Sequence, residues 1–241
     1  MSATAVPQLK DGAKLTDATR YRRVLGKLKY LCFTRLDINF TVNKLSQFMH
    51  SPSEVHWKAL RRVLRYLQGT IQLALHSQRD NDFNLYMYSD ADWDGDVNDQ
   101  ASTTGYILFF GQNLVSWSSN KQRTIAFSST EAEYRVVASA LAETNWVTNL
   151  LKELHVSLPQ APTIYCDSVG ATYLCANPYF HSRVKNIVVD FHFIRKQVQN
   201  LVHIVHIHAA YQLANTFTKA LPKTAFDKHL LKLGMVTHCL S

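Results

Sequence analysis

The stretch Leu85-Tyr-Met-Tyr-Ser-Asp-Ala-Asp-Trp-Asp-Gly-Asp96 joins an apolar, aromatic start to an acidic end. Residues 85–88 are of the types that favour a β-strand. The carboxylates follow where that strand should end. The stretch therefore predicts the first strand of a sheet, with an acidic cluster at one end of it.

A calcium loop is the first alternative for this cluster. Asp90, Asp92, Asp94 and Gly95 match the first, third, fifth and sixth positions of an EF-hand. Position twelve is Ala101, where a bidentate glutamate is required, and the preceding segment has a strand pattern instead of a helical one. The sequence therefore argues against an EF-hand.

The region after residue 83 predicts an α/β fold. Strand patterns alternate with helical ones in the order three strands, helix, strand, helix, strand, helix. Such an order calls for a five-stranded mixed sheet with helices on both faces. The expected strands are 85–88, 104–110, 114–117, 163–166 and 202–207, and the long amphipathic helix spans about 130–155.

The first part of the chain differs in both pattern and charge. Residues 1–89 hold 14 Lys and Arg against 6 Asp and Glu, and residues 90–241 hold 12 of each, so the first part carries the whole excess of +8. Three helical patterns occupy it, near residues 17–31, 38–48 and 53–69, and Asp17 and Ser53 are the expected N-caps of the first and third. We expect a basic helical extension over residues 1–80 and an α/β domain over residues 81–241.

One face of the third predicted helix is basic. Lys58, Arg61, Arg62 and Arg65 share that face. Such a stripe could follow a nucleic-acid backbone, and a solvated helix face explains it equally well.

The amino-acid composition indicates a globular protein. The apolar share of 46% and the charged share of 18% are those of a globular protein with a substantial core. Apolar runs such as residues 105–110 are far shorter than the ~20 residues of a membrane span, and the N-terminus lacks a secretion signal pattern. The four cysteines form no CxxC pair, so we expect reduced thiols in an intracellular protein, with no membrane partner.

Two glutamates open the long helix, and helical geometry separates them. Glu131 lies three residues after Ser128, the spacing of a capping box, and four before Arg135, the spacing of an ion pair. Glu133 heads the stripe that faces the sheet. Residues two apart lie roughly 200° apart around a helix, so only Glu133 is expected to point inward.

A third acidic position is Asp167, which ends the buried strand 163–166. A carboxylate leaving an apolar strand needs a compensating cation or hydrogen bonds. Asp90, Glu133 and Asp167 together form a set of hard oxygen ligands suited to Mg²⁺ or Mn²⁺.

Eight segments in family order resemble copia-type retrotransposon polyproteins, at the end of the reverse transcriptase and its RNase H domain. They are Tyr21-Arg-Arg-Val-Leu-Gly-Lys-Leu-Lys-Tyr-Leu31, Thr34-Arg-Leu-Asp-Ile38, His56-Trp57 with Arg62-Val-Leu-Arg-Tyr-Leu-Gln-Gly-Thr70, Ser89-Asp-Ala-Asp-Trp93, Ser128-Ser-Thr-Glu-Ala-Glu-Tyr134, Tyr165-Cys-Asp-Ser168, Val189-Asp-Phe-His-Phe-Ile194 and Gln212-Leu-Ala-Asn-Thr-Phe-Thr-Lys219. The extension then resembles the thumb or connection of the reverse transcriptase. The resemblance implies location in a cytoplasmic virus-like particle or the nucleus.

The resemblance also implies an activity. An RNase H of this family cuts the RNA strand of RNA–DNA hybrids with two Mg²⁺ ions, for which Mn²⁺ can substitute, held by four carboxylates. The first three correspond to Asp90, Glu133 and Asp167. Asn215 stands at the fourth, catalytic position, where the family has Asp, and we expect it to weaken the site. The alternative is an inactive, domesticated or decayed fragment that binds nucleic acid or a protein.

Overall fold

The computed structural model describes residues 12–96, 99–177, 187–198 and 202–237. These residues form two compact units. The helical unit contains residues 12–76, 99 and 219–237, and the sheet unit contains residues 77–96, 100–177, 187–198 and 202–218. The domain boundary expected at residues 80/81 stays a prediction, although the contacts group residues 219–237 with the helical unit.

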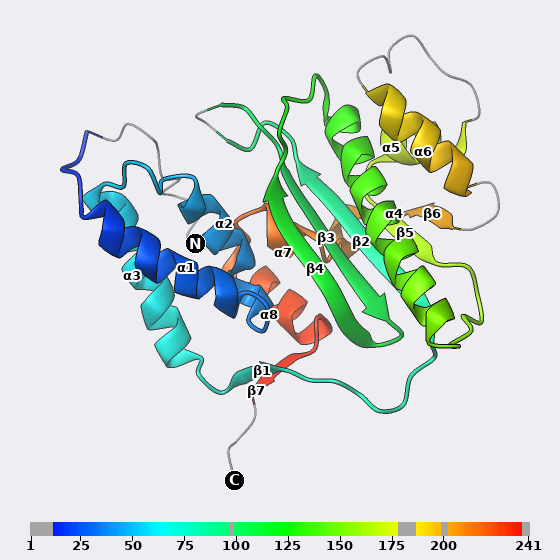
Figure 1. The fold of residues 1–241 in the computed structure, drawn as a ribbon, viewed down its shortest axis with the longest axis horizontal. Coiled ribbons are helices and arrows are strands. Elements are labelled where there is room, and N and C mark those ends of the chain that lie inside the picture. Colours follow the sequence, from blue (N-terminus) through cyan, green and yellow to red (C-terminus); the bar gives the residue numbers. More distant parts are fainter. Residues whose placement is uncertain (1–11, 97–98, 178–186, 199–201, 238–241) are drawn as a thin grey trace. The chain divides into compact units, whose positions relative to one another are not determined.

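The sheet unit is built on five strands in the order β4-β3-β2-β5-β6 (Figure 1). β2, β3 and β4 pair antiparallel, and β5 and β6 add parallel to β2. The bounds are β2 Leu85–Asp92, β3 Thr103–Phe110, β4 Asn113–Lys121, β5 Thr163–Cys166 and β6 His203–His206. The predicted five-stranded mixed sheet is confirmed.

Side-chain alternation gives this sheet two differently covered faces. Met87 and Leu108 are cross-strand partners whose side chains pack in one core cluster with residues of helix α4, Ser129–Glu153. Asp90 and Gly105 are partners on the opposite face, where a Cβ at Gly105 would lie 2.7 Å from Thr218. Helix α7, Asn215–Thr218, packs closely there because Gly105 has no side chain. Helices therefore cover both faces, as predicted for the RNase H-like fold.

Shorter elements complete the sheet unit. Helices α5 and α6 pack against each other and against α4, and Phe191 and Ile194 of α6 are buried in the same core. A short 3₁₀ turn precedes α7. The bounds are α5 Val169–Ala176, α6 Val188–Val198 and η3 Ala209–Tyr211.

The helical unit contains the three helices predicted near its start. Asp17 Oδ1 accepts from the N–H of Thr19 at 2.9 Å, and Ser53 Oγ accepts from His56, so both predicted N-caps are confirmed. The core of this unit includes Tyr21 and Leu60. The bounds are α1 Ala18–Leu31, η1 Leu36–Ile38, α2 Asn39–Ser46, α3 Glu54–Gly69, β1 Leu73–Leu75, α8 Lys223–Lys232 and β7 Met235–Thr237.

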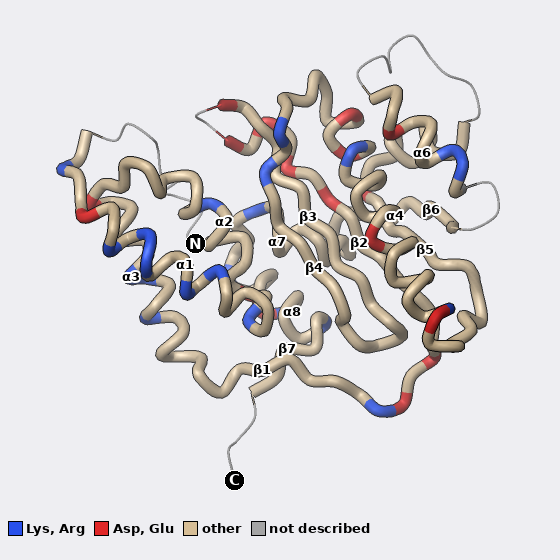
Figure 2. Tube along the Cα trace, in the orientation of Figure 1, with Lys and Arg blue, Asp and Glu red and all other residues tan. Residues whose placement is uncertain are grey.

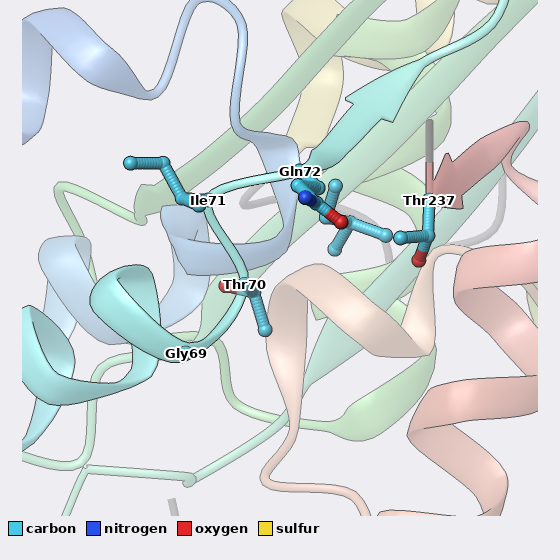
Figure 3. A pocket seen from close by; sticks show the side chains of 6 residues that line it. Gly69, Thr70, Ile71, Gln72 and Thr237 are labelled. Atoms are coloured by element: carbon cyan, nitrogen blue, oxygen red, sulfur yellow. The ribbon is translucent and has the colours of Figure 1, made fainter. Parts of the chain in front are cut away.

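The two short strands of the helical unit come from distant parts of the chain. β1 pairs antiparallel with β7, so that Leu73 lies opposite Thr237. A pocket of about 160 Å³ lies beside this pairing (Figure 3), lined by Gly69, Thr70, Ile71, Gln72, Leu73 and Thr237. Local sequence patterns did not predict this ribbon, because each strand has only three residues.

Two further features bear on the class of protein. Among the described residues, no helix combines the length and apolar character needed to cross a membrane. The described cysteines, Cys32, Cys166 and Cys175, are free thiols and all are buried. The fourth, Cys239, lies outside the described residues.

Candidate active site

Three ligand-bearing side chains meet where α4 crosses the ends of β2 and β5. Glu133, Cys166 and Asp167 each offer one ligand atom, and these atoms all lie within 4.8 Å of one another. Glu133 and Cys166 are buried, and Asp167 is half-buried. The sequence predicted the two carboxylates as site residues but not the thiol near them.

Glu133 is held between two strands. Its Oε1 accepts from the backbone N–H of Ala91 at 3.1 Å, and its Oε2 lies 3.8 Å from Cys166 Sγ, which donates to it. Ser128 caps α4, so its second turn presents Glu133 to the sheet. The carboxylate is therefore fixed in place by β2 and β5 together.

Glu131 forms the ion pair predicted for it, but its carboxylate accepts from Phe127 and does not complete a capping box with Ser128. Its Oε1 forms an ion pair with Arg135 Nη2 at 2.6 Å, and its Oε2 accepts from the N–H of Phe127 at 3.1 Å. Both partners lie at the start of α4 and in the loop before it. The predicted ion pair is confirmed, and Glu131 stabilises the helix start.

Asp90 lies on the other face of β2 and is fully buried. The hydroxyl of Thr218 in α7 donates to its Oδ2. Asp90 does not belong to the group that Glu133, Cys166 and Asp167 form. The next residue in the chain, Ala91, donates its N–H to Glu133 and so connects Asp90 to that group.

Asn215 begins α7 and is 8% exposed. Its Nδ2 donates to the carbonyl of Ala209 at 3.2 Å, and its backbone carbonyl lies 3.5 Å from Thr218 Oγ1, whose single proton goes to Asp90. Thr218 therefore contacts both Asp90 and the backbone of Asn215. An aspartate at position 215 would have no N–H for the Ala209 carbonyl, so the amide also has a local structural role.

Two buried polar side chains attach the segment 209–218 to the sheet. Gln212, which is fully buried, donates from Nε2 to the carbonyl of Ser89 at 2.8 Å. Ser119 on β4 donates to the carbonyl of Phe217 at 2.7 Å. The sequence did not identify either residue as a positioning residue. Only the place of Gln212, three residues before Asn215 in the motif, pointed to it.

The thiol of Cys166 is in an unusual electrostatic environment. Burial raises its pKa strongly, and the nearby Glu133 carboxylate raises it further, whereas the N–H of Ser168 lowers it. At neutral pH the residue is therefore a neutral thiol. Two carboxylates beside a neutral thiol offer hard oxygen donors, which fits a Mg²⁺ or Mn²⁺ ion.

Asp96, which ends the acidic stretch that first suggested a calcium loop, has a structural role. Asp96 is 3% exposed and pairs with Lys121 Nζ at 2.8 Å. Trp93 donates from Nε1 to the carbonyl of Ala126 at 3.0 Å. These contacts tie the loop to the end of β4 and to the segment before α4.

The predicted basic stripe lies on α3 in the helical unit (Figure 2). All four of its side chains are exposed. A groove of about 500 Å³ runs along this helix, and its described lining is Lys58, Arg61, Leu64 and Arg65. The role of the stripe in nucleic-acid binding stays a prediction.

Comparison with known proteins identifies the chain's relatives. It is 53% identical over 228 residues to "Retrovirus-related Pol polyprotein from transposon RE1" and 52% identical over 229 residues to that from transposon RE2, both of Arabidopsis thaliana. These alignments cover 94% and 95% of the chain but 16% of each relative, so the chain spans about one-sixth of their length.

No protein-family model matches the chain. Among solved structures, the crystal structure of LC11-RNase H1 in complex with RNA/DNA hybrid aligns with 61% of the chain and 99% of that protein. The TM-score is 0.43 and the identity is 15%. Relationship by sequence and the topology of the sheet unit lead to one conclusion: over nearly its whole length the chain is a relative of retrovirus-related Pol polyproteins from transposons, and its sheet unit has the five-stranded mixed sheet expected of the RNase H-like fold.

Proposed function

We propose that the sheet unit is a metal-dependent endonuclease that cuts the RNA strand of RNA–DNA hybrids, with Asp90, Glu133 and Asp167 as metal ligands. The observation that carries this proposal is the convergence of Glu133 and Asp167 at the strand ends. Asp90 lies one residue from the N–H that Glu133 binds.

Each residue has a distinct role in this proposal. Bound Mg²⁺ would supply a reactive water and stabilise the leaving oxygen of the phosphodiester. Glu133 is held rigidly by Ala91 and offers its second oxygen to the site. Asp167 is half-buried and follows β5, and its carboxylate is the second proposed ligand beside Glu133. Thr218 orients Asp90 by donating to one of its oxygens.

Asn215 is the weak position of the site in this proposal. It supplies an amide where the family resemblance implies a fourth carboxylate. The side chain keeps one oxygen but carries no negative charge. We therefore infer slow cleavage in Mg²⁺ and partial recovery in Mn²⁺.

The helical unit contributes phosphate contacts in the proposal. Lys58, Arg61, Arg62 and Arg65 are exposed along one face of α3 and could neutralise the hybrid's backbone. The remainder of a reverse transcriptase is a second proposed partner. Replacing Lys58, Arg61 and Arg65 by Ala should lower the slope of log affinity against log salt by about 0.7–0.9 per cation. An unchanged slope would leave the stripe as a solvated face.

The experiment for the enzyme follows cleavage of a hybrid labelled on its RNA strand. We expect 5′-phosphate and 3′-hydroxyl products, made slowly in Mg²⁺ and faster in Mn²⁺. Asp90→Asn is the blank. Cleavage that does not rise above this blank in either metal would refute the proposed activity.

Two observations favour a second function, a module that binds nucleic acid without cutting it. The Asn215 amide is built into the fold through the Ala209 carbonyl, and Asp90 already has a donor in Thr218. A binding module would hold the hybrid with equal affinity in the wild type and in Asp90→Asn, and neither would cut it. Measured affinity and cleavage on the same samples separate the two functions.

A further inference from the structure

The Cys166 thiol lies within 4.8 Å of the two carboxylates of the candidate site, and hydrolysis as proposed above does not use it. Its sulfur is fully buried and lies 3.8 Å from Glu133 Oε2. Asp167, the next residue, brings the second carboxylate into the same group. A sulfur and two carboxylate oxygens thus form a mixed donor set.

The spacing of these donors suits a tetrahedral metal. Zinc–sulfur bonds of about 2.3 Å and zinc–oxygen bonds of about 2.1 Å at a tetrahedral angle place sulfur and oxygen about 3.6 Å apart. The observed separation of 3.8 Å between Cys166 Sγ and Glu133 Oε2 is close to this value. A cation could therefore bind both atoms with little movement of the protein.

A second contact supports a sulfur ligand at this position. The backbone N–H of Ser168, the N-cap of α5, donates to Cys166 Sγ at 3.4 Å. A donor of this kind fixes the position of the sulfur beside the two carboxylates. The contact exists because residues 166–168 turn from β5 directly into α5.

Sulfur changes which cation this group selects. Mg²⁺ takes oxygen ligands, whereas zinc and other soft cations also take thiolate. A soft cation that binds Cys166 forms a metal–sulfur bond and releases the thiol proton to solvent. It would use the same Glu133 and Asp167 carboxylates on which the proposed hydrolysis depends.

We propose that Glu133, Cys166 and Asp167 form a binding site for thiophilic divalent cations such as Zn²⁺ and Cd²⁺, and that their binding inhibits hybrid cleavage. The binding half of this proposal stands on the donor set alone. The inhibition half rests on the proposed function.

The test uses Cd²⁺ as a spectroscopic probe on the full chain. Titration should produce the ultraviolet charge-transfer band of a cadmium–thiolate bond, with one site per chain. Cys166→Ser should lose the band. Cys175→Ser, a matched change of another buried cysteine, and the triple change of Cys32, Cys175 and Cys239 to Ser should keep it. No band in the wild type, or an unchanged band in Cys166→Ser, would overturn the proposal.

A second pair of variants keeps the test decisive if Cys166→Ser fails to fold. Glu133→Gln should weaken Cd²⁺ binding about tenfold or more, because it removes a charged ligand but keeps the thiol. Glu131→Gln should leave the affinity unchanged, since Glu131 pairs with Arg135. Equal Cd²⁺ affinity in both variants would contradict the site.

A cleavage assay tests the proposed metal site separately from the proposed nuclease activity. In Mg²⁺, added Zn²⁺ should inhibit the wild type, and Cys166→Ser should require at least about tenfold more Zn²⁺. Zn²⁺ inhibition that is identical in both proteins would refute the regulatory half. If no variant cleaves but the cadmium band behaves as expected, the proposed function fails and the metal site stands.

Discussion

The two sides of the candidate site are built by opposite means. On the Glu133 side, two carboxylates converge around a thiol, and one backbone N–H holds Glu133. On the Asp90 side, the Thr218 hydroxyl donates to the carboxylate and the Asn215 amide donates to the carbonyl of Ala209. The comparison teaches that the first side gathers two carboxylates and a thiol within 4.8 Å, whereas on the second side the structure pairs a single carboxylate with a hydroxyl donor.

The largest expected effect is on cleavage in Asp90→Asn, which removes a charge from a buried side chain that we propose as a metal ligand. We expect a loss of about a thousandfold, equal to roughly 4 kcal/mol of transition-state stabilisation. The measurement is the single-turnover rate in Mg²⁺ with hybrid affinity followed in Ca²⁺. Asp80→Asn, on an exposed loop, is the matched control. A loss in both variants, or in neither, would remove Asp90 from the site.

Gln212→Ala tests how the Asp90 side is held to the sheet. The buried amide donates to the carbonyl of Ser89, so its loss leaves that acceptor without this donor. We expect a loss of about 1–3 kcal/mol in the free energy of unfolding, measured by urea denaturation. Gln112→Ala, an exposed glutamine, should change it by less than about 0.5 kcal/mol. Equal stability of the two variants would show that Gln212 does not position α7.

Asn215→Asp adds a negative charge to the Asp90 side of the candidate site, so that side should become more like the Glu133 side. At an effective dielectric of ~20, a unit charge at ~4 Å contributes roughly 4 kcal/mol, and a third of this is about tenfold in metal affinity. We expect cleavage in Mg²⁺ to rise about tenfold while hybrid affinity in Ca²⁺ stays nearly constant. Asn215→Ala, which also loses the bond to Ala209, should not gain activity. If Asn215→Asp cuts no faster, the binding-module function is favoured.

The smallest expected effect is that of Glu131→Gln. The same substitution at the nearby Glu133 should have a much larger effect on cleavage. Glu131→Gln weakens a partly exposed ion pair with Arg135, so we expect about 0.5 kcal/mol of lost stability. Cleavage should stay within about twofold. Glu133→Gln should abolish most cleavage under the same conditions. A reversed order would mean that the proposed roles of the two glutamates are exchanged.

The succession of strands and helices, and the direction of the side chains around helix α4, were predictable because both depend on local periodicity. Strand patterns placed β3 within one residue of its observed bounds, but β2 continues to Asp92, four residues beyond its predicted end, so Asp90 lies inside the strand. The two-residue spacing of Glu131 and Glu133 separated an ion-paired side chain from a sheet-facing one. The β1–β7 ribbon was not predictable in this way, because residues 73–75 find their partners about 160 positions later.

The sequence by itself determined the succession of strands and helices along the chain, the alternation of side chains on each strand and the identity of the carboxylates, since periodicity and residue type are local properties. The order of the strands within the sheet, β4-β3-β2-β5-β6, came from the tertiary structure. Only the tertiary structure decided which groups meet. It placed the Cys166 sulfur against Glu133, placed Thr218 against both Asp90 and the backbone of Asn215, and engaged the Asn215 amide with Ala209. Those contacts join residues up to 128 positions apart, and their distances depend on how α4 and α7 pack on opposite faces of one sheet.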